Sequence, residues 1–298
     1  MRRWSVSFAK FALVLAAFLG GLMLWNLRPP AVPEPQLLDP VEAPESFEPL
    51  RLRVVTWNVW GLRWISPRRA ERIAALAREV AALRPDVVGF QEAFVAKDRA
   101  TLAEALRPLG LEHTRYYPSG LAGSGLFLAS RYPIESEGFI RFAKNGRPER
   151  VDHGDWWAGK GLSLATVTLP GGVRLYLGNT HLHAGYRGNP YLDTRVAQAG
   201  QLVPWAQRVR ATGCPALWMG DWNNTPGNEA LAPLAEAGAW NLLTGDMRAI
   251  DHIFGSGEGW EWRLVEEGKH NGRLETDPEV PWSDHAARWV EVELRKAL

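Results

Sequence analysis

The sequence is poor in cysteine and in net charge, and each shortage excludes a class of protein. Cys214 is the single cysteine among 298 residues, so the chain can form neither an intramolecular disulfide nor a thiolate-rich metal site. The formal net charge is +1, which predicts no strong overall attraction to nucleic acid, because non-specific DNA binding depends on clustered Lys and Arg. With 46% hydrophobic residues, a globular protein with a large core remains.

Long apolar runs are also scarce, and the one that stands out is at the N-terminus. Residues 11–27 carry no charge and follow Arg2, Arg3 and Lys10. As a helix this run would be roughly 25 Å long, slightly shorter than the bilayer's apolar core of about 30 Å. We expect residues 1–27 to form a signal anchor, with the rest of the chain outside the cytoplasm, or alternatively a cleaved signal peptide of a secreted protein.

The rest of the chain divides into a short linker and one domain. Residues 28–50 are rich in Pro and Glu and are predicted to be an extended tether. From residue 51 to residue 298 strand-like and helix-like patterns alternate. The first unit has a strand over 51–57, a helix with Ser66 as its N-cap and Pro67 in its first turn, and a second strand over 86–90.

A second strand–helix–strand unit follows in the latter half of the domain. It has strands over 173–180 and 215–220 on either side of a helix over 191–211. The strands of both units end in polar residues, namely Asn58, Glu92, His181 and Asp221. Because ligands gather beyond the carboxyl ends of strands in α/β sheets, we expect these four side chains to converge.

Several shorter strand-like runs lie between and after the two units. A hairpin is predicted at residues 170–172, where Pro-Gly-Gly separates two apolar runs. Many antiparallel strands with few helices predict a mixed α/β fold in which two packed sheets are covered by helices.

The polar residues at the strand ends suit a hard cation. Carboxylate and amide oxygens favour Mg²⁺, Mn²⁺ or Ca²⁺ over Zn²⁺. His181 and His183 lie two residues apart on one face of a strand and could form a zinc pair, but this alternative needs a further ligand. The candidates for that ligand are His153, His252 and His285.

Three short segments carry groups suited to acid–base chemistry. In GDWNN, Asp221 and Asn223 place an anionic acceptor beside a neutral amide, which could orient a water and a phosphoryl oxygen; alternatively, they close an Asx-rich turn. The pairs Asp251-His252 and Asp284-His285 could combine across segments, so that a carboxylate fixes a histidine as general base. Each pair could equally be a polar strand entrance.

Taken in order, the motifs TWNVWG, FQE, NTHLH, GDWN, IDHI and SDH resemble those of the endonuclease/exonuclease/phosphatase superfamily. The resemblance spans residues 51–298 and implies a deoxyribonuclease I-like, four-layer α/β sandwich with two packed mixed β-sheets flanked by helices. Three further segments, HGDWWAGKG, THLHAGY and YLDTRVAQAGQL, are similar to the neutral sphingomyelinase branch.

The resemblance also implies roles for individual residues. Glu92 and Asn58 would bind Mg²⁺, or Mn²⁺ as an alternative, and Asp284 would line the metal or the phosphate. His285, oriented by Asp251, would be the general base, although the sequence does not decide between His285 and His181. The remaining catalytic candidates are His181, Asp221, Asn223 and Lys160, and the expected substrate-binding residues are Asp155, Trp156, Trp157, His183 and Tyr186.

The segment HGDWWAGKG admits two interpretations. Asp155 and Lys160 could form an ordinary surface ion pair, or Lys160 could reach the phosphodiester while Asp155 controls its position. Trp156 and Trp157 could stack on a choline-like cation, an attraction of roughly 0.5 to 2 kcal/mol, or could contact lipid. His183 could support the site or only cap its loop.

Three functions are consistent with these features. The first is a Mg²⁺-dependent phosphodiesterase that cleaves sphingomyelin-like phospholipids at a membrane surface. The second is an exported nuclease of the same fold, whose partner would be nucleic acid, and the near-neutral charge weighs against it. The third is a non-catalytic module that binds lipid or protein. The intact set of carboxylates and histidines weighs against this third function, and no specific protein partner is inferred.

Overall fold

The computed structural model describes residues 2–38, 47–63, 65–150, 152–236 and 241–297. The helices are α1 (Arg2–Asn26), α2 (Arg69–Ala82), α3 (Ala96–Leu106), α4 (Asp155–Ala158), α5 (Leu192–Ala211) and α6 (Ala232–Glu236). The strands are β1 (Leu50–Asn58), β2 (Val87–Gln91), β3 (His113–Tyr116), β4 (Phe127–Ser130), β5 (Ile134–Arg141), β6 (Gly161–Thr168), β7 (Arg174–His181), β8 (Ala216–Asp221), β9 (Asn241–Leu242), β10 (Asp251–Ser256), β11 (Trp260–His270), β12 (Arg273–Leu274), β13 (Asp277–Pro281) and β14 (Ala287–Lys296).

The strands form two six-stranded mixed sheets and a small two-stranded one. The first sheet has the order β11-β14-β1-β2-β4-β3 and the second β5-β6-β7-β8-β10-β9. Each large sheet contains one parallel pair, β1 with β2 and β7 with β8. Antiparallel pairing of β6 with β7 confirms the predicted hairpin at residues 170–172.

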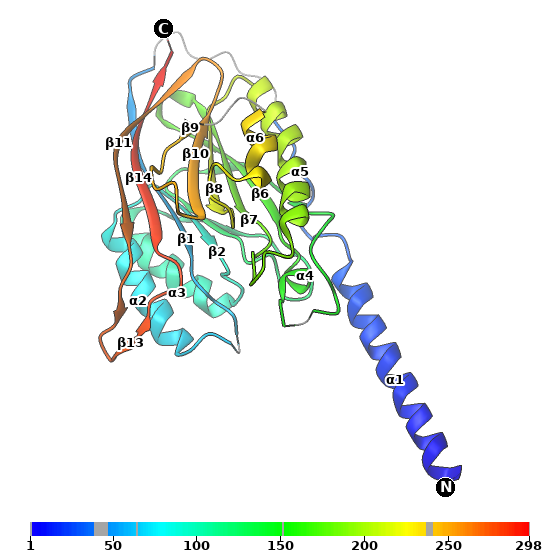
Figure 1. Cartoon of the computed structure of the whole chain (residues 1–298). Coiled ribbons are helices and arrows are strands. Elements are labelled where there is room, and N and C mark those ends of the chain that lie inside the picture. Colours follow the sequence, from blue (N-terminus) through cyan, green and yellow to red (C-terminus); the bar gives the residue numbers. More distant parts are fainter. Residues whose placement is uncertain (1, 39–46, 64, 151, 237–240, 298) are drawn as a thin grey trace.

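Helices cover the outer faces of both large sheets, which gives four layers (Figure 1). Buried side chains of α2 and α3 pack on the first sheet, and those of α5 on the second. A third apolar cluster fills the space between the sheets, where Leu52 and Val54 of β1 meet Leu217 and Met219 of β8. The predicted four-layer sandwich is therefore confirmed.

Helix α2 illustrates why the local sequence folds as it does and where the prediction was wrong. Ile73, Leu76 and Val80 recur at helical spacing, and all three are buried against the sheet. Ser66 is not the N-cap, because its hydroxyl donates to the Leu62 carbonyl at 2.7 Å. The helix instead begins after Arg68, whose φ of 43° is left-handed and which caps nothing with its side chain.

Helix α1 extends away from the domain and is joined to it at its last residue (Figure 1). Asn26 is completely buried. Its Nδ2 donates to the Trp156 carbonyl at 2.9 Å, and its Oδ1 accepts from the Leu121 backbone N–H at 2.6 Å. In the described part of the chain, no helix is both long and apolar enough to cross a membrane.

The segment after α1 lies along β5. The Phe139 N–H donates to the Pro33 carbonyl at 2.8 Å, and the Ser136 hydroxyl donates to the carbonyl of Gln36 at 3.1 Å. Phe47 packs edge-on against Trp260, with ring centroids 5.2 Å apart. The predicted linker is thus extended but attached to the domain at both of its described ends, and residues 39–46 lie outside the described residues.

Candidate active site

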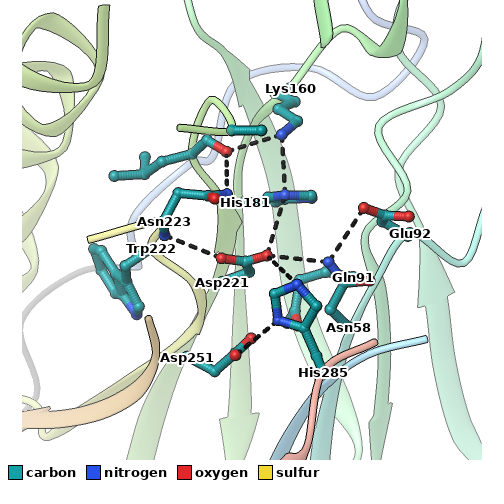
Figure 2. A network of polar contacts seen from close by, with 12 residues as sticks. Asn58, Gln91, Glu92, Lys160, His181, Asp221, Trp222, Asn223, Asp251 and His285 are labelled. Carbon is teal, nitrogen blue, oxygen red and sulfur yellow. Dashed lines mark hydrogen bonds and ion pairs between the residues drawn. The ribbon is translucent and has the colours of Figure 1, made fainter. Parts of the chain in front are cut away.

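The two parallel strand pairs carry the predicted polar residues to one edge of the sandwich. Asn58 at the end of β1 is opposite Gln91, and His181 at the end of β7 is opposite Asp221 of β8. The sheets meet face to face here, since Asn58 Nδ2 donates to Asp221 Oδ2 at 3.0 Å across 163 positions of sequence. Figure 2 shows the resulting network with Asp221 at its centre.

Asp221 is almost fully buried and surrounded by donors and histidines. Its Oδ1 accepts from the Asn223 backbone N–H at 3.0 Å. The Nε2 atoms of His181 and His285 lie 3.3 and 3.7 Å from Asp221 Oδ2. Burial opposes ionisation, but the electrostatic interactions with His181, His285 and Lys160 outweigh it and lower the pKa of Asp221. Asp221 is therefore an anion that orients its neighbours.

His285 and Asp251 form the predicted pair from two separate segments. His285 Nδ1 donates to Asp251 Oδ2 at 2.8 Å, which leaves Nε2 directed toward Asp221. Burial alone would lower the pKa of His285, but Asp221, Asp251 and Asp284 together raise it to about 10. Burial and the charge of Asp221 raise the pKa of Asp251 to about 6. Asp251 thus fixes the orientation of the imidazole, and the raised pKa means that the ring carries a proton on Nε2 at neutral pH.

Glu92 lies beside this network at the end of β2. Its Oε1 accepts from Asn58 Nδ2 at 3.2 Å. The residue has a φ of 57°, and the absence of a side chain at Gly61 accommodates it, because a Cβ there would lie 2.2 Å from the Glu92 carbonyl oxygen. Burial raises the pKa of Glu92 to about 7. This backbone arrangement directs a carboxylate into the site.

The donor set fits a divalent cation. Glu92 Oε2 and Asp251 Oδ1 are buried carboxylate oxygens without a hydrogen-bond partner among the described residues. Such oxygens are costly to bury unless a cation or a donor meets them. Asp221, Asp251 and His285 also bring ligand atoms within 4.8 Å of one another. Mostly oxygen ligands suit a hard cation of the Mg²⁺, Mn²⁺ or Ca²⁺ type.

Asp284 and the zinc alternative fit this arrangement less well. Asp284 is exposed and accepts a hydrogen bond from Ser283 at 3.3 Å, and its charge raises the pKa of His285 and of Glu92, so it lies at the rim of the network. Within the described ranges, the cluster of three potential metal ligands contains His285 with two carboxylates, and neither His181 nor His183. The structure therefore gives no support to a His181–His183 zinc pair.

Lys160 enters the site from the segment after α4. Lys160 and Asp155 are each 4% exposed and form an ion pair, which excludes the surface ion pair considered from sequence. The Lys160 ammonium also donates to the Leu182 carbonyl at 2.8 Å and lies 2.9 Å from His181 Nε2. Burial opposes ionisation of Asp155, but Lys160 and His183 hold its pKa at about 2. Lys160 is thus a buried cation held between Asp155, His181 and the Leu182 carbonyl.

His181 lies next to Lys160, and Asn223 donates to the same Leu182 carbonyl as Lys160 (Figure 2). Burial and the charge of Lys160 lower the pKa of His181 to about 3, so the ring is neutral at neutral pH and can accept from the ammonium. Asn223 has a φ of 49°, and its Nδ2 donates to the Leu182 carbonyl at 3.0 Å. Both of the predicted residues therefore lie in the network.

The predicted substrate-binding residues separate into two groups. Tyr186 donates to Asp155 Oδ2 at 2.6 Å, and His183, which is 1% exposed, places Nδ1 2.9 Å from the Ala184 carbonyl. Both side chains therefore lie next to Asp155, since His183 Nδ1 is also 4.0 Å from Asp155 Oδ2. Trp156 and Trp157 of α4 are partly exposed and pack edge to face, with centroids 4.7 Å apart. Their contact with a choline-like cation stays a prediction.

Several buried residues that support the site are absent from the sequence-based predictions. Gln91 Nε2 donates to Asn179 Oδ1 at 2.7 Å and links the sheets beneath the network. Arg195 and Gln198 of α5 are buried beside the loops after β7 and β8. The signal available was the segment YLDTRVAQAGQL, in which these polar residues occur on a helix that is otherwise apolar on its inner face.

The fold and the site define a class of two-sheet α/β sandwich in which carboxylates, amides and a His–Asp pair converge at the carboxyl ends of strands. More particularly, the chain belongs to the Endonuclease/Exonuclease/phosphatase family, whose model matches residues 55–285. The resemblance noted in the sequence is therefore confirmed.

Known relatives include several enzymes of sphingolipid cleavage. The chain is 35% identical over 179 residues to a putative neutral sphingomyelinase of Drosophila melanogaster, covering 59% of this chain and 40% of the relative. It is 34% identical over 180 residues to sphingomyelin phosphodiesterase 2 of Homo sapiens, and 34% identical over 177 residues to an inositol phosphosphingolipids phospholipase C of Schizosaccharomyces pombe. Both matches cover 59% of this chain and 42% of the relative. The chain thus spans about 40% of the length of these curated relatives.

Solved structures share the fold. Beta toxin of Staphylococcus aureus matches with a TM-score of 0.62 at 16% identity, covering 80% of this chain and 99% of that one. Sphingomyelinase C of Streptomyces griseocarneus matches with a TM-score of 0.59 at 17% identity, covering 81% and 99%. A humanized Danio rerio TDP2 matches with a TM-score of 0.61 at 18% identity, covering 81% and 98%.

Proposed function

We propose that the chain hydrolyses the phosphodiester of a sphingomyelin-like choline phospholipid, giving ceramide and phosphocholine. The observation that carries the hydrolytic part is the placement of the His285–Asp251 pair beside Asp221, next to Asn58 and Glu92. The names of the sphingolipid-cleaving relatives support the substrate class.

In the proposed reaction a water oxygen bonds to phosphorus while the P–O bond to the lipid alcohol breaks. One histidine of the network takes a proton from the attacking water, and the departing lipid alkoxide takes a proton from solvent water. His285 is favoured as the base because Asp251 fixes its ring and directs Nε2 toward the site. The pKa of His285 would be lowered by the charge of a divalent cation held nearby, so that Nε2 could take the proton. Asp221 orients the imidazole and the water.

Lys160, Asn223 and neutral His181 would contact the phosphoryl group from the opposite side. A cation and an amide placed in advance stabilise negative charge that grows on the phosphoryl oxygens in the transition state. Glu92, with Asn58 and the carboxylates near it, would hold Mg²⁺, or Mn²⁺ as an alternative. When bound, a divalent cation supplies charge that polarises a phosphoryl oxygen and offsets the negative charge on the leaving group.

We also propose that residues 1–27 bring the domain to the outer face of a membrane, as an uncleaved anchor or as a signal peptide that is removed. The basic residues before the apolar run support this orientation. Cell fractionation with N-terminal sequencing of the mature protein tests it. A full-length chain found only in the soluble cytoplasmic fraction would contradict it.

The function is tested with the full chain and Mg²⁺, offered sphingomyelin vesicles, an inositol phosphosphingolipid and plasmid DNA. We expect release of phosphocholine from sphingomyelin, with none from His285→Ala. Cleavage of the inositol lipid alone would reassign the head group. Nicked DNA with intact lipid would replace the proposal with a nuclease of the same fold, and binding without turnover would favour a non-catalytic module.

A further inference from the structure

The segment YLDTRVAQAGQL begins α5 and buries two long polar side chains outside the network described above. Arg195 is 2% exposed and Gln198 is fully buried. Three residues apart on a helix, they lie on one face. Burying such side chains costs hydration and rotamer entropy, so hydrogen bonds must compensate.

The Arg195 guanidinium bridges the loops that follow β7 and β8. Its Nη1 donates to the carbonyls of His183 and Ala184 at 3.5 and 3.3 Å, and Nη2 donates to Asn189 Oδ1. On the other side, Nε donates to Asn224 Oδ1 at 3.2 Å. These acceptors are neutral oxygens, so the contacts fix the relative positions of the two loops rather than neutralise an acid.

Gln198 holds the same loop after β7 and also reaches the segment that carries Lys160. Its Oε1 accepts from the His183 N–H at 2.8 Å. Its Nε2 donates to Asn145 Oδ1 at 3.1 Å, and Asn145 Nδ2 in turn donates to the Lys160 carbonyl at 3.3 Å. Gln198 thus connects the loop that carries His183 with the segment that contains Asn145, which in turn contacts the backbone of Lys160.

Leu182 directly precedes His183 and Ala184, whose backbone Arg195 and Gln198 hold. The Leu182 carbonyl accepts from both proposed phosphate-binding donors. Lys160 Nζ donates to it at 2.8 Å and Asn223 Nδ2 at 3.0 Å. The Leu182 N–H donates to the Asp221 carbonyl at 2.9 Å. A displacement of the loop would therefore move the shared acceptor and redirect Lys160 and Asn223 together.

We propose that Arg195 and Gln198 are positioning residues that set the direction in which Lys160 and Asn223 face the substrate phosphodiester. The proposal rests on the proposed function for the nature of the substrate. A displacement of about 1 Å in a reacting group can cost up to about 100-fold in rate, even when the altered residue is remote from the chemistry.

The test compares variants of the full chain on sphingomyelin vesicles and on bis(p-nitrophenyl) phosphate, below the melting temperature of each. Arg195→Lys keeps the charge but loses the guanidinium fork. We expect its kcat to fall about 10- to 100-fold with KM within about threefold of wild type. Gln198→Met is an independent second variant with the same expected signature. Arg208→Lys is the control, because Arg208 is exposed on the same helix and stacks on Trp205.

Coupling to the proposed targets separates positioning from general destabilisation. Adding Arg195→Lys to Asn223→Ala should lower kcat by less than about threefold further, since both changes disturb one unit. If the double variant loses kcat by the product of the two single losses, the proposal is overturned. A wild-type kcat in both Arg195→Lys and Gln198→Met would also overturn it.

Failure of the proposed function gives a different result. If the wild-type protein cleaves the small diester but not sphingomyelin, the proposed lipid substrate is wrong. The comparison of the variants on the small diester would still test the positioning role. Binding of inorganic phosphate with Mg²⁺, measured by calorimetry, gives a readout independent of turnover. About tenfold weaker binding by Arg195→Lys is expected although KM is nearly unchanged, because the phosphate dianion carries charge that the diester gains only in the transition state. Unchanged binding would contradict the positioning role.

Discussion

His285 donates from Nδ1 to Asp251 at 2.8 Å, and this contact leaves Nε2 as the ring atom that faces Asp221. The pair is separated by 34 positions and joins the start of β10 to the loop before β14. It fixes both the orientation and the tautomer of the ring, which a general base requires.

Replacing Asp251 by Asn should therefore remove activity while keeping the fold. The amide can reach the same Nδ1 position, but it favours the wrong tautomer and removes the charge that stabilises a protonated ring. We expect kcat to fall by about 10² to 10⁴, the contribution of general acid–base catalysis. Steady-state kinetics with sphingomyelin measures it, and the Asp251→Asn/His285→Ala double variant should be no worse than His285→Ala alone. A loss below tenfold for Asp251→Asn would contradict this role.

Removal of the metal should abolish turnover, and binding of the metal should depend on Glu92. If Mg²⁺ binds only the folded state, it stabilises that state by about 2.7 kcal/mol when its concentration is 100 times the dissociation constant. We expect Mg²⁺ to raise the melting temperature of wild type and to have little effect on Glu92→Gln, because the amide lacks the anionic oxygen left unpartnered in Glu92. Thermal unfolding with Mg²⁺ or EDTA tests this. Activity that persists in EDTA would exclude the proposed metal dependence.

The Asp155–Lys160 ion pair should make stability depend on pH in the acid range. The pKa of Asp155 is lowered from 3.8 to about 2 in the folded protein, which corresponds to about 2 kcal/mol of stabilisation. A lowered folded-state pKa contributes fully above the unfolded-state value, and the contribution is lost as the pH falls from about 4 to about 2. The difference in unfolding free energy between wild type and Asp155→Asn should shrink over this range.

Urea unfolding at several pH values measures that difference. Asp193→Asn is the matched control, because Asp193 is paired with Lys144 on the surface and exposed pairs contribute little. A wild-type to Asp155→Asn difference that stays constant between pH 5 and pH 2 would show that the folded state does not hold Asp155 as an anion.

The contact between α1 and the domain should depend on Asn26. Asn26→Ala removes the partners of the Trp156 carbonyl and the Leu121 N–H, and each buried backbone group left unpaired costs about 1 to 3 kcal/mol. We expect faster hydrogen exchange in residues 119–122 and 156–158, with little change in β1 or β8. Exchange that matches wild type in both loops would show that the joint is not maintained in solution.

The fold was largely predictable because its signals are local. Alternating and continuous apolar runs located the strands of both parallel pairs, and helical spacing of Ile73, Leu76 and Val80 located α2. The start of α2 was wrong, since Ser66 has the usual capping chemistry but bonds to Leu62 instead. A helix boundary depends on competing hydrogen bonds of similar strength, which the sequence does not rank.

The sequence predicted which residues come together in the network, but it predicted less well how they contact one another. Strand ends brought Asn58 and Asp221 to the same edge, but their direct contact depends on how the two sheets pack face to face. The family resemblance placed Asp284 with the metal ligands; the residue is exposed in the structure, and its role as a ligand stays a prediction. The roles of Arg195 and Gln198 could not be read from a helical pattern, because their partners lie on loops distant in sequence.

The buried Asn26 joint attaches α1 to the domain as an arm that extends away from it. Two left-handed glycines let the three backbones meet, since a Cβ on Gly120 would lie 2.9 Å from both Asn26 Oδ1 and the Gly159 N. The arm is 25 residues long, about 37 Å, and exposes apolar side chains such as Phe11 and Phe18 along its length. Because Gly159 directly precedes Lys160, any surface that captures the arm also brings the Lys160 side of the candidate site close to that surface.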